Sequence, residues 1–195
     1  MSRNAEVRRR TGETDVRVSL DLDGSGRALV STGVGFFDHM LTLLAAHARL
    51  DLEVEATGDL ATGSHHTVED VGITLGQALD RALADRSGIE RYGTAFVPMD
   101  ECLAHAALDL SGRPFLAFDV SLPATTIGGF ETDLLSEFLR GMVNHAGITL
   151  HLRLLAGENP HHVIEACFKA VARAIAAAVA LNPRVAGVPS TKGVI

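Results

Sequence analysis

The amino-acid sequence predicts an α+β fold in which the chain is internally duplicated, and two observations support this prediction. First, Phe36–Val54 aligns with Leu134–Leu152, and each segment is an amphipathic helical stretch that runs directly into an alternating strand. Second, the helical segments 65–83 and 161–179 open with the same His-His-x-x-Glu motif. Each half should therefore be a two-layer α/β sandwich, in which helices cover one face of a mainly antiparallel sheet.

The region before the first helix of each half predicts paired strands. Val16–Ser31 and Cys102–Phe118 both contain Leu-Asp-Leu, followed by a Gly-containing turn and a return strand. This pattern is typical of a β-hairpin, so we expect the two strands of each segment to lie side by side. Each half then has the element order strand, strand, strand, helix, strand, helix.

The boundary between the halves is expected near Ser87–Glu90, because the first long helix should stop at Gly88. Residues 1–89 then form the first half and residues 90–195 the second. With 195 residues, the chain can bury one full-sized core or two small fused ones. We expect the two halves to make one compact catalytic unit, since two copies are too few for a solenoid.

Composition limits the class of protein. An apolar content of 47% and a charged content of 21% are typical of a soluble globular protein. The formal net charge of −7 argues against a nucleic-acid partner. No apolar run approaches the roughly 20 residues of a membrane span, and the charged N-terminus lacks the apolar core of a signal peptide. Two widely separated cysteines, Cys102 and Cys167, fit a reducing environment, so we expect a cytoplasmic protein.

The repeated motif indicates metal binding. On a helix, residues four apart share a face, so His65 lies over Glu69 and His161 lies over Glu165. The second histidine of each pair is rotated by about 100° and should serve a different ion. Burying such groups without a purpose would be costly, so the two copies predict a pair of equivalent metal sites.

The register of the repeat adds two further candidate ligands. In the alignment of the halves His39 meets Glu137, and both lie near the start of a predicted helix. All of the candidate donors are nitrogen or oxygen atoms. Such a set favours Mn, Fe, Co or Zn over a sulfur-rich structural zinc site, and a six-coordinate ion such as Mn²⁺ would leave positions open for substrate.

Cationic groups outside the motifs suggest a phosphorylated ligand. Arg91, Arg113 and Lys169 stand apart from the ligand motifs, and the tail 189–193 reads Pro-Ser-Thr-Lys-Gly. A Ser-Thr-Lys-Gly turn offers hydroxyls, backbone N–H groups and an ammonium to a phosphate. Beside a two-metal site, these groups point to a phosphorylated small molecule.

Taken together, the motifs resemble those of the imidazoleglycerol-phosphate dehydratase family, the lyases of histidine biosynthesis. The resemblance covers essentially the whole chain and rests on separated blocks in order: FDHML, HHTVEDVGI, LGQAL, MDE, SGRP, ITLHLRLLAGENPHH, EACFKAVARA and STKG. It implies a duplicated fold and an assembly of twenty-four subunits built from trimers. It also implies two Mn²⁺ ions in each active site, with the active sites at subunit interfaces.

The resemblance also implies roles for particular residues. The implied metal ligands are His39, His65, His66, Glu69, Glu137, His161, His162 and Glu165. Repeat symmetry suggests two sets, one of His65, Glu69, Glu137 and His162 and the other of His39, His66, His161 and Glu165. The implied substrate contacts are Glu13, His39, His47, Arg91, Arg113, Lys169, Ser190 and Lys192, together with the ligands His65, His66 and His161.

Two positions depart from the family pattern. Many members carry His where this chain has Glu137, but a carboxylate can replace an imidazole on Mn²⁺, so we keep the position as a ligand. The segment 59–64 is less acidic than the usual lead-in to the first histidine pair. This difference concerns the local geometry and leaves the ligands unchanged.

The implied reaction converts D-erythro-imidazoleglycerol phosphate to imidazole-acetol phosphate and water. The carbinol C–H of the substrate is not acidic, so a base alone is insufficient. Our hypothesis is that the two ions hold the substrate ring as an imidazolate, which expels hydroxide and makes the next C–H acidic. Glu13 is our first candidate for the base that removes this proton, and Glu165 is the second.

Two other interpretations stay open at this point. A two-metal hydrolase of a phosphate ester would use paired ions in a similar way, but it would release inorganic phosphate. Alternatively, the metals would only hold an oligomer together, and no metal-filled form would turn over an imidazole phosphate. Neither interpretation accounts for Glu13, the Ser-Thr-Lys-Gly tail and the doubled ligand set together.

Overall fold

The computed structural model describes residues 3–195. The first half consists of β1 (Asn4–Arg10), β2 (Thr14–Asp21), β3 (Ala28–Ser31), α1 (Gly35–Ala48), β4 (Asp51–Gly58), the short helix η1 (Leu60–Thr62) and α2 (His65–Leu83). The second half consists of β5 (Tyr92–Met99), β6 (Cys102–Asp109), β7 (Phe115–Asp119), β8 (Thr126–Ile127), β9 (Phe130–Glu131), α3 (Leu134–Ala146), β10 (Thr149–Ala156) and α4 (Pro160–Val179). The predicted element order is confirmed in both halves. The β8–β9 pair is an addition in the second half that the sequence analysis did not identify.

The two main sheets have the same topology, with strand orders β1-β2-β4-β3 and β5-β6-β10-β7. Neighbouring strands run antiparallel except for β3 with β4 and β7 with β10, which are parallel. The helices α1 and α3 therefore provide the crossover connections that parallel neighbours need. This shared topology is the structural expression of the repeat found in the sequence.

The predicted hairpins within Val16–Ser31 and Cys102–Phe118 are wrong. In the first half β4 inserts between β2 and β3 and pairs with β2 along its whole length. The turn after β2 is held by Asp51 of β4, whose Oδ1 accepts hydrogen bonds from the backbone N–H groups of Ser25 and Arg27 at 2.8 and 3.0 Å. β2 therefore pairs with β4, which is distant in the sequence, and not with the nearby β3 that the turn suggested.

The end of α2 also differs from the expectation. The helix ends at Leu83 instead of continuing to Gly88. Ala84 and Arg86 both have positive φ angles, of 48° and 60°, which α-helical backbone does not allow. The Arg86 guanidinium is buried and donates a hydrogen bond to the Ala146 carbonyl oxygen at 3.0 Å. α2 therefore ends earlier than predicted, and Arg86, just after the helix, packs against the second half.

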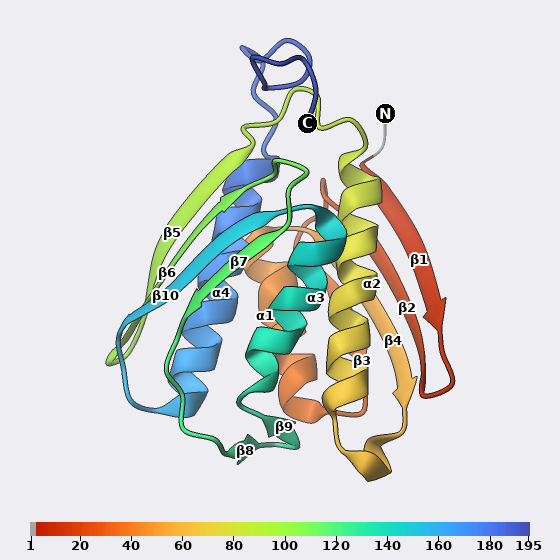
Figure 1. Cartoon of the computed structure of the whole chain (residues 1–195), viewed down its shortest axis with the longest axis vertical. Helices are drawn as coiled ribbons and strands as arrows, with labels where there is room; N and C mark the ends of the chain where they lie inside the picture. Colours follow the sequence, from red (N-terminus) through yellow and green to blue (C-terminus); the bar gives the residue numbers. More distant parts are fainter. Residues whose placement is uncertain (1–2) are drawn as a thin grey trace.

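Each half is a two-layer sandwich, and the two halves pack helix to helix (Figure 1). In the first half α1 and α2 cover the inner face of their sheet, and in the second half α3 and α4 do the same. The helices meet in the middle, α2 against α3 and α1 against α4. Gly141 permits a close approach, since a Cβ at this position would lie 3.0 Å from the Glu69 carbonyl oxygen.

The hydrophobic core continues from one half into the other. Phe37 of α1 packs on Phe130 and Phe138 at ring-centroid distances of 5.7 and 5.3 Å, and Phe138 packs on Phe168 of α4 at 5.3 Å. All four rings are essentially inaccessible to solvent. The shared core fixes α1 against α4 and α2 against α3, and these helices carry the candidate metal ligands. Within residues 3–195, no helix is both long and apolar enough to cross a membrane.

Candidate metal and phosphate sites

Both histidine pairs lie in the first turn of a helix. α2 begins at His65, and α4 begins at Pro160, so His161 and His162 follow directly. The Asn159 side chain caps α4 by accepting a hydrogen bond from the His161 backbone N–H at 3.0 Å. Proline at the first helical position and an Asn cap both favour a helix start at this point, so local sequence determines where the second pair stands.

His39, His161 and Glu165 form one cluster, to which α1 contributes His39. The Glu165 Oε2 atom lies 3.6 Å from His39 Nε2 and 3.4 Å from His161 Nε2. The other oxygen of Glu165 accepts a hydrogen bond from Lys169 Nζ at 2.6 Å. Burial raises the pKa of Glu165, but the Lys169 hydrogen bond and nearby positive charges outweigh burial, so its pKa is lowered overall. The carboxylate is therefore available as a charged ligand.

His65 and Glu69 form the equivalent cluster on α2. The His65 Nε2 and Glu69 Oε2 atoms are 3.6 Å apart. Glu137 occupies the first turn of α3, one turn before the point where Gly141 packs on the backbone of Glu69. Its carboxylate lies 3.6 Å from Arg140 Nε. In the alignment of the halves, Glu137 corresponds to His39 and Glu69 corresponds to Glu165.

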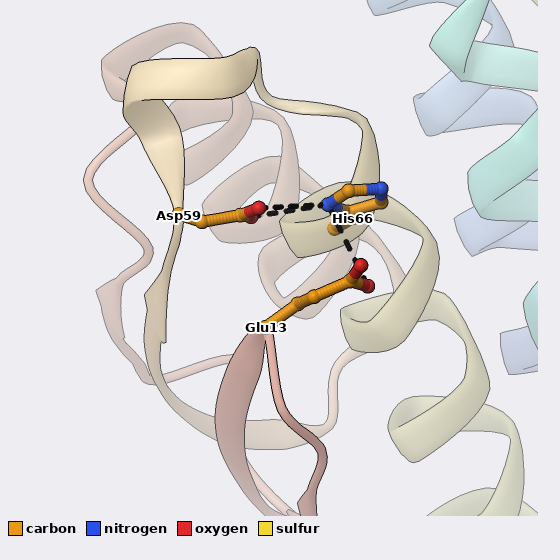
Figure 2. Close-up of side chains that lie close together, drawn as sticks. All are labelled: Glu13, Asp59 and His66. Carbon is orange, nitrogen blue, oxygen red and sulfur yellow. Dashed lines mark hydrogen bonds and ion pairs between the residues drawn. The ribbon is translucent and has the colours of Figure 1, made fainter.

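His66 turns toward two carboxylates of its own half (Figure 2). Its Nδ1 atom lies 3.1 Å from both oxygens of Asp59 and 3.6 Å from Glu13 Oε2. The hydrogen bond with Asp59 raises the pKa of His66 and lowers that of Asp59. A carboxylate on Nδ1 fixes the ring and its tautomer, which leaves Nε2 to bind a metal.

His162 has the same kind of partner in the second half. Its Nδ1 atom lies 2.8 Å from Glu101 Oε2, and Asp100 lies near its Nε2 atom at 3.8 Å. The Glu101 Oε1 atom accepts a hydrogen bond from the Asn159 backbone N–H at 3.0 Å. The hydrogen bond from His162, together with this backbone contact, lowers the pKa of Glu101 to about 2.

No pattern in the sequence predicted a role for Asp59, Asp100 or Glu101. A carboxylate that holds Nδ1 of a metal-binding histidine is a common supporting contact, but it is recognised only when the tertiary structure brings the two groups together. The Met-Asp-Glu block containing Asp100 and Glu101 was a signal in the sequence, but its function could not be read from spacing.

The donor set fits a hard divalent ion. Imidazole nitrogens and ionised carboxylates suit Mn²⁺, and the supporting carboxylates supply the second layer of contacts that such sites need. Among residues 3–195, ion pairs join only part of each predicted ligand set, namely His39 and His161 to Glu165, and His65 to Glu69. Among the residues that the structure describes, His66 forms no ion pair with Glu165, and His162 forms none with Glu69.

The candidate phosphate residues converge from three segments. Arg91, Arg113, Ser190 and Lys192 line one open cavity of about 700 Å³. Arg91 is fixed by two contacts, since its Nε donates to Asp109 Oδ1 at 2.7 Å and its Nη1 donates to the Pro189 carbonyl oxygen at 2.8 Å. Three cations in one cavity, with a hydroxyl beside them, make a suitable environment for a phosphate.

The cavity lined by Arg91 and the candidate metal clusters lie at opposite ends of the folded molecule. The Arg91 backbone N–H donates to the Ala178 carbonyl oxygen at 2.9 Å, whereas Glu165 lies near the start of the same helix. Thirteen residues of helix separate Glu165 from Ala178, which is about 20 Å at 1.5 Å per residue. Figure 1 shows the C-terminal tail at the end opposite the first turns of α2 and α4.

The remaining predicted substrate contacts do not lie in the phosphate cavity. Lys169 is held at the metal end by Glu165, and its Nζ is also 3.5 Å from Met99 Sδ. His47 lines a separate cavity of about 360 Å³ together with Arg3, Arg49 and Arg173. Within one chain, the predicted substrate contacts are therefore divided among separate regions.

Comparisons with known proteins give a consistent result. A family model described as imidazoleglycerol-phosphate dehydratase matches residues 32–175. The imidazoleglycerol-phosphate dehydratase of Moorella thermoacetica is 57% identical over 195 residues, which is 100% of each chain. That of Symbiobacterium thermophilum is 58% identical over 99% of this chain and 93% of its own.

Solved structures agree with the sequence relatives. The crystal structure of imidazoleglycerol-phosphate dehydratase from Staphylococcus aureus matches with a TM-score of 0.83 and 41% identity, and the match covers 92% of this chain and 99% of that one. The crystal structure of IGPD from Pyrococcus furiosus in complex with (S)-C348 matches with a TM-score of 0.83 and 37% identity, over 97% of this chain and 100% of that one.

Proposed function

The chain belongs to the imidazoleglycerol-phosphate dehydratase family, and we propose that it is a Mn²⁺-dependent hydro-lyase that converts D-erythro-imidazoleglycerol phosphate to imidazole-acetol phosphate. This is a step of histidine biosynthesis. The observation that carries the proposal is the Glu165 carboxylate, which lies within 4 Å of both His39 and His161 and has its counterpart in the His65–Glu69 pair. A doubled nitrogen and oxygen donor set of this kind supports two ions per active site.

Each ion would take most of its ligands from one cluster. His65, Glu69 and Glu137 would serve one ion, and His39, His161 and Glu165 would serve the other. His162 and His66 would complete these sets from neighbouring copies, because among residues 3–195 neither forms an ion pair with the glutamate of its predicted set. A carboxylate of its own chain holds each ring on Nδ1, which leaves Nε2 for the ion. When bound, the ions would supply positive charge that favours the imidazolate form of the substrate ring.

The separation of about 20 Å along α4 supports an active site shared between copies of the chain. In the substrate a three-carbon chain joins the imidazole ring to the phosphate group, so the substrate is much too short to reach from Glu165 to Arg91. The phosphate pocket of one copy would therefore face the metal ligands of another. The family resemblance implies a closed assembly of twenty-four subunits built from trimers. Such an assembly would bring a phosphate pocket against the metal ligands of another copy at every site.

The residues of this chain would share the remaining work. Arg91, Arg113, Ser190 and Lys192 would hold the phosphate, which fixes the position of the carbon chain. The Glu13 carboxylate, which is 58% exposed, would remove the C–H proton after the neighbouring hydroxyl has left. The hydroxyl would leave as water with the proton that the imidazole ring gives up. The enol formed when Glu13 takes the C–H proton would become the ketone by losing its O–H proton and gaining one at the carbon that carried the hydroxyl, and the ring would regain its own proton. Glu165 is the second candidate for the base, but its contacts with His39, His161 and Lys169 favour a role as a ligand.

Turnover by metal-stripped protein, with and without added Mn²⁺, tests the proposal. Ketone and inorganic phosphate would both be followed. Mn²⁺-dependent ketone formation without phosphate release is the expected result. Phosphate release would support a two-metal phosphatase instead, and tight Mn²⁺ binding without any turnover would leave the metals a structural role.

A further inference from the structure

Glu13 and Glu101 occupy the same position in the two halves. Glu13 directly precedes β2 in the turn from β1, and Glu101 directly precedes β6 in the turn from β5. His66 and His162 are likewise the second members of the two histidine pairs. The duplication therefore presents the same glutamate to the same histidine twice.

In the second half this glutamate is fully engaged. The Glu101 Oε2 atom contacts His162 Nδ1 at 2.8 Å, and Oε1 accepts the backbone N–H of Asn159 at 3.0 Å. Both oxygens are used to hold the ring and the start of α4. A carboxylate in this position supports the histidine and is not free to remove a proton from a substrate.

In the first half a second carboxylate has taken this contact. Both oxygens of Asp59 lie 3.1 Å from His66 Nδ1, and Glu13 Oε2 stands farther away at 3.6 Å (Figure 2). Asp59 is the residue directly after β4, and the residue directly after β10 is Gly157, which has no side chain to offer. Thr62 fixes the aspartate by donating from Oγ1 to Oδ2 at 2.9 Å.

We propose that Asp59 is a positioning residue that holds His66 Nδ1 and thereby leaves the Glu13 carboxylate free to act on the substrate. The proposal rests on the proposed function, in which Glu13 is the base. It explains why two equivalent glutamates have different surroundings. It also has a consequence that can be measured, because Glu13 needs to move by only about an ångström to form a hydrogen bond with His66 if Asp59 is removed.

The test compares wild type with Asp59→Ala, Glu13→Gln and the double variant. Turnover and Mn²⁺ affinity are both measured, the latter by titration of the metal-free protein. Asp59→Ala should lower kcat by about 10- to 100-fold, since Glu13 then turns to His66, while Mn²⁺ affinity stays close to that of wild type. Asp59→Asn keeps an acceptor for Nδ1–H and should restore most of the turnover.

The double variant separates this role from a general structural one. Its kcat should equal that of Glu13→Gln alone, because Asp59 acts through Glu13. When Glu13→Ala takes the place of Glu13→Gln in the double variant, Mn²⁺ affinity should fall by about 10- to 100-fold, because neither residue then offers an acceptor to His66 Nδ1–H. Glu101, which holds His162 in the second half, provides the matched control. Glu101→Ala should weaken Mn²⁺ binding to the same extent with or without Glu13→Gln.

Each alternative result identifies what has failed. Wild-type turnover in Asp59→Ala, or losses of kcat that multiply in the double variant, would overturn the role of Asp59. Unaltered Mn²⁺ affinity in the variant that combines Asp59→Ala with Glu13→Ala would overturn the shared hold on His66. If wild type itself forms no ketone, the proposed function fails, and the Mn²⁺ titrations still report on the hold on His66.

Discussion

Glu165 and Arg91 lie near opposite ends of α4. Glu165 is near its start, whereas the backbone N–H of Arg91 donates to the Ala178 carbonyl oxygen at 2.9 Å. The proposed metal ligands and the proposed phosphate pocket of one chain are therefore separated by about 20 Å of helix. If the chain acts on a small imidazole phosphate, each active site has to combine the two ends of different copies.

Arg113→Ala should mainly raise KM. Its guanidinium lines the phosphate cavity and is 70% exposed, so it is available to a ligand. Loss of one charge-assisted contact should raise KM by about 10- to 100-fold with a smaller effect on kcat. Steady-state kinetics check this result. The exposed Arg10 on β1 provides a matched control as Arg10→Ala, and an unchanged KM in Arg113→Ala would argue against a phosphate contact.

Glu137→His should retain turnover with Mn²⁺, since both side chains can bind this ion. An imidazole in place of a carboxylate also removes a negative charge from the ligand set, so we expect the preference to move from Mn²⁺ toward Zn²⁺. Activity and binding would be measured for the metal-free protein reconstituted with each ion. Glu137→Ala should lose both turnover and tight binding of the metal ion. Full activity of the alanine variant with Mn²⁺ would show that Glu137 is not a ligand.

Gly72→Ala should destabilise the contact between the two halves. A Cβ at Gly72 would overlap the carbonyl oxygen of Phe138, where α2 crosses α3, whereas a Cβ at Gly35 has no atoms near it. We expect the free energy of unfolding to fall by about 1–3 kcal/mol in Gly72→Ala, measured in urea. Gly35→Ala serves as the control, and equal stability of the two variants would contradict the close helix contact.

His47 should make stability depend on pH. Burial, followed by the charges of Lys169 and Arg173, holds the pKa of His47 below its usual value of 6.5. The unfolded chain then binds more protons than the folded one in the pH range just below that value, so stability is full above about pH 6.5 and falls as the pH decreases. Urea unfolding of His47→Gln should show a smaller loss between about pH 7 and pH 5 than wild type. Identical losses in the two proteins would rule out this contribution.

Local periodicity allowed the sequence to predict most elements of the fold. The alternation in β2 and β6 and the amphipathic helices depend on neighbouring residues, and the structure has them in the predicted order. The strand pairing could not be predicted in the same way. A Gly-containing turn suggested hairpins, but β4 and β10 take the central positions because of contacts made far along the chain.

In the candidate site, too, contacts within one helix could be predicted from the sequence, whereas contacts between distant segments could not. His65–Glu69 and His161–Glu165 were predicted from helical spacing, and the structure brings each pair together. Asp59 was not predicted as a partner of His66, because the contact depends on how the end of β4 approaches α2. The convergence of Arg91 and Arg113 with the tail is also tertiary. The residue types suggested a phosphorylated ligand, but they did not predict that these three segments share one cavity.

Subunit complementation tests the central claim, a shared active site, most directly. Glu165→Gln removes a proposed metal ligand and should be inactive. Lys192→Ala removes a proposed phosphate contact and, like Arg113→Ala, should turn over little substrate at concentrations well below its raised KM, where all assemblies are assayed. When the two are co-expressed in equal amounts, up to about a quarter of the sites should combine an intact metal end with an intact phosphate end. Recovery of turnover toward that fraction is the result we predict. Mixed assemblies that stay as inactive as their parents would contradict a site shared between copies.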